Sequence, residues 1–320
     1  ARTRALGPAP GWGRCPHAAA EPPPVYAGQI PASPTVTELD GDEVLVVASG
    51  QTVLVLRTAD GALVWERVLG DPDDAEDPTE IEGSPAVADG VIVVPTDVHN
   101  DKEHRSGVVA LALADGTERW TWDPEDGKPI GGCGSVWGSP SVDEDARLVV
   151  VGTGSCFREA SWTAYSEAIV GLDLDTGTPR WSFQPRDELG GQDWDFAGAA
   201  NLFAIGDQEV AGLGNKDGSY YVVDRRDGEL VWEAEAVRQT ANPDGFAFGG
   251  FIGATAVADD GSGAPVVAGG TAVGDCPCQH GFDAATGEPR WQSSDPTGTY
   301  GASAAAGGVV FTSGIDQTLR

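Results

Sequence analysis

The chain has 320 residues, in which 19 Lys and Arg stand against 50 Asp and Glu, so the net charge is −31. A field of that sign repels phosphate backbones and anionic lipid headgroups, which argues against nucleic-acid binding and membrane-surface binding. The 45 Gly and 22 Pro argue against a mostly helical protein, and no apolar run is long enough to span a membrane.

Residues 1–28 are rich in Ala, Pro and Gly, and we expect them to form a flexible N-terminal arm ahead of one domain over residues 29–320. Because the chain contains no Met, we expect it to be a processed product or a fragment. Its few Lys and its five scattered Cys favour an extracytoplasmic location (secreted, periplasmic or cell-surface). The acidity is equally typical of adaptation to salt.

Five segments along the chain share one pattern, which is an apolar alternating stretch, a polar turn ending in Gly, and a Trp four residues after that Gly. The five Trp are Trp65, Trp120, Trp181, Trp232 and Trp291, at intervals of 55, 61, 51 and 59 residues. The alternation predicts a half-buried strand, and the Asp-Gly or Thr-Gly turn supplies the positive φ of a tight hairpin. We expect each Trp to seal one repeat against its neighbour.

A second hairpin precedes several of these units, as in residues 84–94, 139–151 and 302–311. Two hairpins give four antiparallel strands per repeat, and four-stranded sheets at this spacing are typical of a β-propeller. The sequence therefore predicts an all-β propeller with five full blades and a partial sixth blade near the C-terminal end. Since a propeller closes its ring, we expect the full protein to continue past Arg320 to about seven or eight blades.

The Gly-x-x-x-Trp unit resembles the pyrroloquinoline quinone (PQQ) repeat, which is shared by PQQ-dependent alcohol dehydrogenases (quinoproteins) and by non-enzymatic propellers. The stretch from Gly131 to Trp232 resembles the dehydrogenases more specifically. Trp137-Gly-Ser-Pro is similar to the segment that places a Trp beneath the PQQ ring. Val149–Ser155 resembles their Gly-Thr-Gly-Asn, in which the Asn is a calcium ligand.

Two further segments extend the resemblance. Gln192-Asp-Trp-Asp195 is similar to a motif whose last Asp is the proposed catalytic base, and Asn215-Lys216-Asp-Gly is similar to the stretch that presents a cation to the quinone. The resemblance implies PQQ and Ca²⁺ as cofactors, with Asp195 as the catalytic base. It also implies Trp137, Lys216 and Glu103 as PQQ-binding residues. Asp195, Ser155 and Glu103 would be the metal ligands.

The chemistry agrees with these residue types. A carboxylate can take the alcohol proton, a Trp can stack on a flat ring, and a cation can stabilise charge that develops on a quinone oxygen. The expected substrate is a small-molecule or polymeric alcohol or polyol. Because the chain has no Cys-x-x-Cys-His haem motif, the expected electron acceptor is external.

The sequence also departs from the dehydrogenase pattern. Position 155 is Ser rather than Asn, Gly191-Gln192 replaces a His-Asp, and there is no adjacent Cys pair. These departures favour the alternative of a non-catalytic propeller that binds a protein or a polymer.

The cysteines predict one disulfide beside the candidate site. Cys133 lies four residues before Trp137 and Cys156 directly follows Ser155, so a Cys133–Cys156 bridge would brace the loops of that site. Cys276 and Cys278 are the rival pair, and Cys15 is left over.

Overall fold

The computed structural model describes residues 32–71, 76–99, 101, 103–237, 249–259, 263–272, 278–293 and 298–320. The expected N-terminal arm over residues 1–28 therefore lies outside the described residues. Within them the chain is almost entirely β, and its one helical element is the short 3₁₀ helix η1 (Glu159–Ser161). None of the described residues belongs to a helix long and apolar enough to cross a membrane.

Five four-stranded antiparallel sheets and one two-stranded sheet form in chain order from the described residues. We number them blades 1 to 6. Blades 1 to 3 are β1 (Thr35–Leu39), β2 (Asp42–Ser49), β3 (Thr52–Arg57), β4 (Leu63–Val68); β5 (Ala86–Ala88), β6 (Val91–Thr96), β7 (Gly107–Ala112), β8 (Glu118–Trp122); and β9 (Ser141–Asp143), β10 (Leu148–Gly152), β11 (Ile169–Asp173), β12 (Pro179–Phe183). Blades 4 to 6 are β13 (Asn201–Ile205), β14 (Gln208–Gly214), β15 (Ser219–Asp224), β16 (Leu230–Glu235); β17 (Ala256–Ala258), β18 (Val266–Gly270), β19 (Gln279–Asp283), β20 (Pro289–Gln292); and β21 (Ala304–Ala306), β22 (Val309–Phe311).

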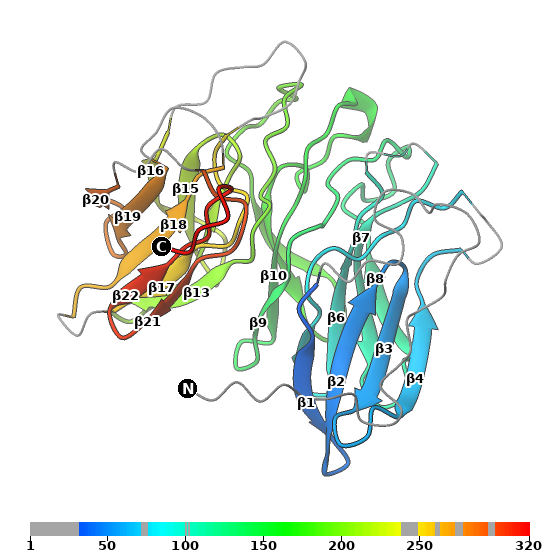
Figure 1. The fold of residues 1–320 in the computed structure, drawn as a ribbon. Helices are drawn as coiled ribbons and strands as arrows, with labels where there is room; N and C mark the ends of the chain where they lie inside the picture. The colour runs from blue at the N-terminus through cyan, green and yellow to red at the C-terminus, as the bar shows by residue number, and fades with distance from the viewer. Residues whose placement is uncertain are drawn as a thin grey trace.

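The blades follow one another around an arc, from blade 1 in blue to blade 6 in red (Figure 1). The first strands of successive blades contact one another, as β1 does β5, β5 does β9 and β13 does β17, so these strands lie on the inner side of the arc. The predicted β-propeller, with five full blades and a partial sixth, is confirmed.

The five repeat Trp occupy equivalent places, since each is the third residue of the fourth strand of its blade. Opposite each Trp the pairing between the third and fourth strands shifts register by a β-bulge. This recurring bulge explains why the turn and the Trp keep one spacing in every repeat.

The Trp also join neighbouring blades, as the sequence predicts. The indole N–H of Trp120 donates to the carbonyl of Leu174 in blade 3 at 2.9 Å, and the other described contacts of this kind are Trp65 to Leu113, Trp181 to Arg225 and Trp232 to Ala284. The same indoles cover the turn glycines. A Cβ on Gly177, whose φ is +69°, would lie 2.4 Å from Trp120 Cε3. A residue with a side chain would therefore be strained there by both its φ and the indole.

The seams between blades 1 to 4 repeat one backbone arrangement, which we call the seam bridge. In each seam, a Gly leads into the first strand of the blade, and the residue three positions before that Gly accepts a hydrogen bond at its carbonyl. The donor is a backbone N–H just beyond the second strand of the same blade. The three bridges are Asp97 N to Glu80 O at 2.9 Å, Gly154 N to Ser135 O at 2.7 Å and Lys216 N to Asp195 O at 2.9 Å. The next residue in each case donates to a carbonyl of the preceding blade, at the last residue of its second strand or at the residue that follows it, as Val136 N does to Thr96 O. Three successive blades thus present side chains at equivalent places on one face.

Candidate functional site

A cavity of about 400 Å³ opens at these seam bridges. It is lined by residues of three successive blades, namely Glu82, Asp97 and His99 of blade 2, Ser135, Trp137, Gly154 and Ser155 of blade 3, and Asp193, Asp195 and Lys216 of blade 4. Four of the five site residues predicted from the sequence therefore meet in one cavity. These are Trp137, Ser155, Asp195 and Lys216, which span 80 residues of chain from 137 to 216.

Asp195 lies at the centre of the polar contacts in this cavity and is buried. Its Oδ1 accepts the backbone N–H of Ser155 at 2.6 Å, and its Oδ2 lies 2.6 Å from Lys216 Nζ. Lys216 Nζ also reaches Asp193 Oδ1 at 3.1 Å. Asp193 and Asp195 therefore face one cation, as expected of residues two positions apart in an extended segment.

Lys216 carries the positive charge of this group. Burial opposes its charged form, but the Asp195 and Asp193 carboxylates outweigh that effect and raise the pKa of Lys216. Its Nζ also lies 4.8 Å from the centre of the Trp137 ring, which is a cation–π distance. The ammonium group thus sits between the two carboxylates and the indole.

Two carboxyls of the cavity are shifted toward the neutral form. Burial, and then the charge of Asp195, raise the pKa of Asp193 to about 6 against the opposing effect of Lys216. Burial, and then Asp97, raise the pKa of Glu82 to about 7. Both values follow from several carboxylates sharing one poorly solvated space.

A second layer of contacts fixes the segment that carries the two aspartates. The carbonyl of Trp194 accepts the Asn215 side-chain amide at 2.8 Å, and the Arg186 guanidinium lies 5.5 Å from the centre of the Trp194 ring. Arg186 in turn pairs with Asp217 at 2.6 Å and with Glu167 at 3.3 Å. Trp194 does not line the cavity, whereas Asp193 and Asp195 on either side of it do.

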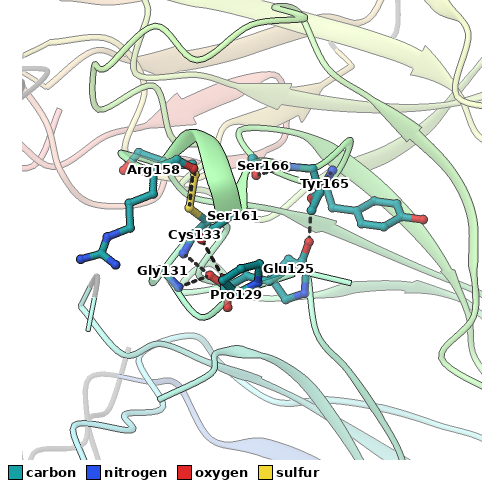
Figure 2. Close-up of a disulfide and its surroundings, with 12 residues drawn as sticks. Glu125, Pro129, Gly131, Cys133, Arg158, Ser161, Tyr165 and Ser166 are labelled. Carbon is teal, nitrogen blue, oxygen red and sulfur yellow. Dashed lines mark hydrogen bonds between the residues drawn. A yellow bond between two sulfur atoms is a disulfide. The ribbon is translucent and has the colours of Figure 1, made fainter. Parts of the chain in front are cut away.

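The predicted disulfide is present, with 2.00 Å between the sulfurs of Cys133 and Cys156 (Figure 2). It ties the segment that leads to Trp137 to the residue that follows Ser155. The buried Glu125 carboxylate accepts the backbone N–H groups of Gly131 at 2.7 Å and Cys133 at 3.1 Å. Cys278 takes part in another disulfide, whose second cysteine lies outside the described residues.

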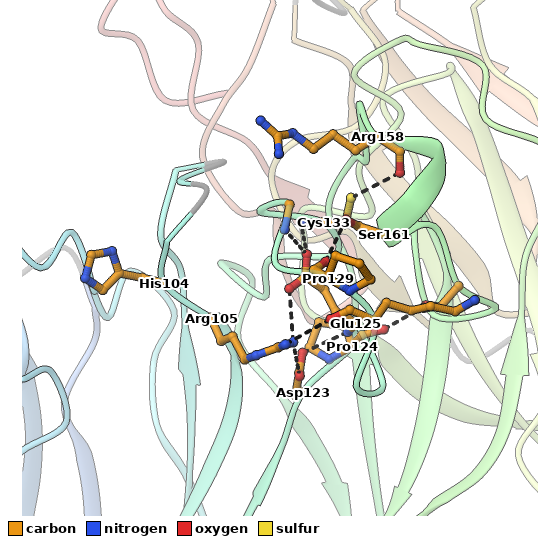
Figure 3. A network of polar contacts seen from close by, with 12 residues as sticks. His104, Arg105, Asp123, Pro124, Glu125, Pro129, Cys133, Arg158 and Ser161 are labelled. Atoms are coloured by element: carbon orange, nitrogen blue, oxygen red, sulfur yellow. Dashed lines mark hydrogen bonds and ion pairs between the residues drawn. The ribbon is translucent and has the colours of Figure 1, made fainter.

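Arg105 extends this support on the other side of Glu125 (Figure 3). Its guanidinium contacts Asp123 at 2.5 Å and Glu125 at 3.2 Å, and it donates to the carbonyl of Lys128 at 2.9 Å. The loop ahead of Trp137 is therefore fixed by a disulfide, a buried carboxylate and an arginine together.

Glu103 is the exception among the predicted site residues, because the structure does not bring it to the cavity. It is exposed on the loop after β6, where its backbone N–H donates to Asp101. Glu82, Asp97 and His99 line the cavity on the blade-2 side instead. The repeat could have indicated Glu82, since Glu82-Gly-Ser-Pro is the blade-2 equivalent of Trp137-Gly-Ser-Pro.

Comparison with known families decides what kind of propeller this is. Residues 50–245 match the model of the glucose/ethanol/alcohol dehydrogenase β-propeller domain, a PQQ family. The chain belongs to this family. The matched range contains every residue that lines the cavity.

Relatives at modest identity are dehydrogenases. The chain is 30% identical over 235 residues to XoxF of Paracoccus denitrificans, described as a dehydrogenase, a match that covers 59% of this chain and 37% of the relative. It is 32% identical over 178 residues to the glycerol dehydrogenase large subunit of Gluconobacter oxydans, covering 47% and 24%. The chain therefore spans well under half the length of these relatives.

Solved structures support the fold. A europium-containing methanol dehydrogenase superimposes with a TM-score of 0.61 at 15% identity, and the match covers 89% of this chain and 67% of that one.

The cavity residues fit the chemistry of the cofactors that this family implies. Asp193, Asp195 and Ser155 are oxygen donors, which Ca²⁺ prefers. The Trp137 indole borders the cavity and suits stacking on a flat ring. The Ser135 hydroxyl is buried in the cavity wall with no hydrogen-bond partner, so the wall has a polar group left to satisfy.

Proposed function

We propose that this propeller is the PQQ-binding part of an oxidoreductase that oxidises an alcohol or a polyol. The observation that carries the proposal is the convergence of Trp137, Ser155, Asp195 and Lys216 on one cavity, together with membership of a dehydrogenase family. The relatives named for glycerol and for alcohols support a hydroxyl-bearing substrate.

In this proposal, Asp195 accepts the proton of the substrate hydroxyl. The Ser155 N–H donates to one of its oxygens and Lys216 contacts the other, so both groups would hold the carboxylate in place in the cavity. Lys216 also provides positive charge where negative charge develops during oxidation. The chemistry that bound PQQ supplies is the acceptance of two electrons at an electrophilic quinone carbonyl.

The remaining residues would hold the cofactors. Trp137 would stack on the PQQ ring, while Asp195 and Ser155 would serve as Ca²⁺ ligands, with Asp193 as a further carboxylate beside them. Glu103 would contribute only if its loop moved toward the cavity. An external acceptor would take the electrons, and we propose an extracytoplasmic location for the protein.

One observation favours a second candidate function, a non-catalytic propeller that binds a protein or a polymer. Lys216 Nζ lies 4.8 Å from the centre of the Trp137 ring and pairs with Asp195, so a flat ligand that stacks on this face of Trp137 would compete with the ammonium group. In the non-catalytic alternative this ion pair is permanent.

Incubation with PQQ and Ca²⁺, followed by gel filtration, tests the choice through the quinone absorbance that stays with the protein. We expect Trp137→Ala to abolish this retention, while Trp291→Ala, a change at an exposed Trp of blade 5, leaves it intact. Asp195→Asn should retain PQQ but lose turnover with an artificial electron acceptor by about 100-fold or more. Ser155→Asn should raise the affinity for Ca²⁺. Absence of retained quinone in the unmodified protein would favour the non-catalytic candidate.

A further inference from the structure

On the blade-2 side of the cavity, three potential metal ligands converge. Glu80, Glu82 and His99 each place one ligand atom within 4.8 Å of the others. His99 Nε2 lies 2.9 Å from Glu80 Oε2. This group shares no residue with Ser155 of blade 3 or with Asp193 and Asp195 of blade 4, which line the same cavity.

Asp97 orients the imidazole of this group. Its Oδ2 lies 3.2 Å from His99 Nδ1, and its Oδ1 accepts the backbone N–H groups of Val98 at 2.7 Å and of His99 at 3.1 Å. A carboxylate that accepts Nδ1–H fixes the tautomer in which Nε2 carries the lone pair. That nitrogen faces Glu80 Oε2 at 2.9 Å, and a bound metal ion would take the place of the proton that this contact requires, while Asp97 keeps Nδ1–H.

A second and independent observation comes from blade 3. Ser135 occupies the seam-bridge place equivalent to Glu80. The residue is 6% exposed, and its hydroxyl has no hydrogen-bond partner in the structure. It lines the same cavity as Glu82 and His99. A buried hydroxyl without a partner is uncommon in folded proteins, and a metal-bound water beside it would provide one.

The charges of the cavity point the same way. Glu82, Asp97, Asp193 and Asp195 line it, and Lys216 is the one lysine or arginine among its described lining residues. Lys216 is already engaged by the two aspartates of blade 4. The carboxylates of blade 2 face the His99 ring, and a divalent ion bound between them would offset their charge.

We propose that Glu80, Glu82 and His99 bind a divalent transition-metal ion of the Zn²⁺ type, with Asp97 as the residue that positions His99. A mixed set of one imidazole and two carboxylates suits Zn²⁺ better than Ca²⁺, which takes oxygen ligands. Three protein ligands leave a coordination position for water or for an anionic group in the cavity. The proposal does not depend on PQQ binding.

Calorimetric titration of the metal-free protein with Zn²⁺ tests this proposal. We expect about one equivalent to bind, and His99→Ala or Glu80→Gln to abolish that binding. Asp97→Asn should weaken the affinity by roughly 10- to 100-fold, as expected when the partner of a ligand is lost. The matched control is His104→Ala, because His104 pairs with Asp101 and does not line the cavity.

Co²⁺ provides a spectroscopic readout, since its visible absorption reports the coordination geometry of the bound ion. The spectrum of the Co²⁺-loaded protein should disappear in His99→Ala and persist in both His104→Ala and Asp195→Asn, with circular dichroism confirming the fold of each. Zn²⁺ affinity that is unchanged in His99→Ala and Glu80→Gln would overturn the proposal. So would loss of the Co²⁺ spectrum in Asp195→Asn, because the metal would then belong to the blade-4 side.

Discussion

Replacing Lys216 by Met tests whether the cavity depends on its one buried lysine. The side chain is 11% exposed, and its ammonium group contacts Asp195 at 2.6 Å and Asp193 at 3.1 Å. Methionine preserves most of the apolar stem and removes the charge. Both carboxylates are then left in a poorly solvated space without the cation that they share.

The expected loss follows from the cost of breaking a buried ion pair by removing one partner, which is about 3–5 kcal/mol. This loss should depend on pH. Asp193 already has a raised pKa of about 6, and without Lys216 that pKa rises further. The folded state then binds more protons than the unfolded state, so the stability of the variant increases as the pH falls through this range. The difference from the unmodified protein should be largest near pH 8 and smaller near pH 5.

Urea unfolding at both pH values measures this difference. The control is Lys128→Met, because Lys128 is exposed and its replacement should change the unfolding free energy by no more than about 0.5 kcal/mol. Addition of Ca²⁺ should restore part of the lost stability, since two adjacent carboxylates again gain a cation. A loss that is equal at both pH values, or no larger than that of Lys128→Met, would refute the reasoning.

Two further predictions concern the scaffold. Gly177→Ala should destabilise more than Gly206→Ala, because both glycines have positive φ but only Gly177 faces an indole, that of Trp120. The unfolding free energy should fall by about 1–2 kcal/mol for Gly206→Ala, and by about 1–3 kcal/mol more for Gly177→Ala. Equal denaturation midpoints for the two variants would contradict the packing of Trp120 against this turn. Replacing Cys133 and Cys156 together by Ser should lower the unfolding free energy by about 3 kcal/mol for a 23-residue separation. An unfolding free energy equal to that of the oxidised protein would show that the bridge does not constrain the unfolded chain.

Much of the fold could be predicted because its signals are local. Alternating apolar residues, a turn glycine and a Trp at fixed spacing define each hairpin. The structure places Trp65 and the four other repeat Trp at one equivalent position. The meeting of Trp137 with Asp195 and Lys216 could also be predicted, since loops of successive blades converge on one face.

The blade-2 side of the cavity could not be predicted with the same success. Glu103 lies in a loop after β6, where the repeat no longer fixes the path of the chain. Glu80 and Asp97 come from segments 17 residues apart, and their proximity depends on a backbone bridge that no local pattern specifies. Glu82 stands at the blade-2 position equivalent to Trp137, so the repeat alone could have placed it near the cavity. A carboxylate does not resemble the stacking Trp of the dehydrogenases, however, and the resemblance therefore did not indicate Glu82 as a site residue.

The seam bridge has a consequence for how such a protein can change its chemistry. Glu80, Ser135 and Asp195 stand on the same backbone framework in three successive blades, held by hydrogen bonds between main-chain atoms alone. The same backbone position therefore carries a carboxylate in blades 2 and 4 and a hydroxyl in blade 3. Because only main-chain atoms form the seam bridge, a substitution at one of these positions can change the chemistry of the cavity while the loop lengths and the strand pairing stay the same. Duplication of a blade would add one more such position, at which a new functional side chain could be placed.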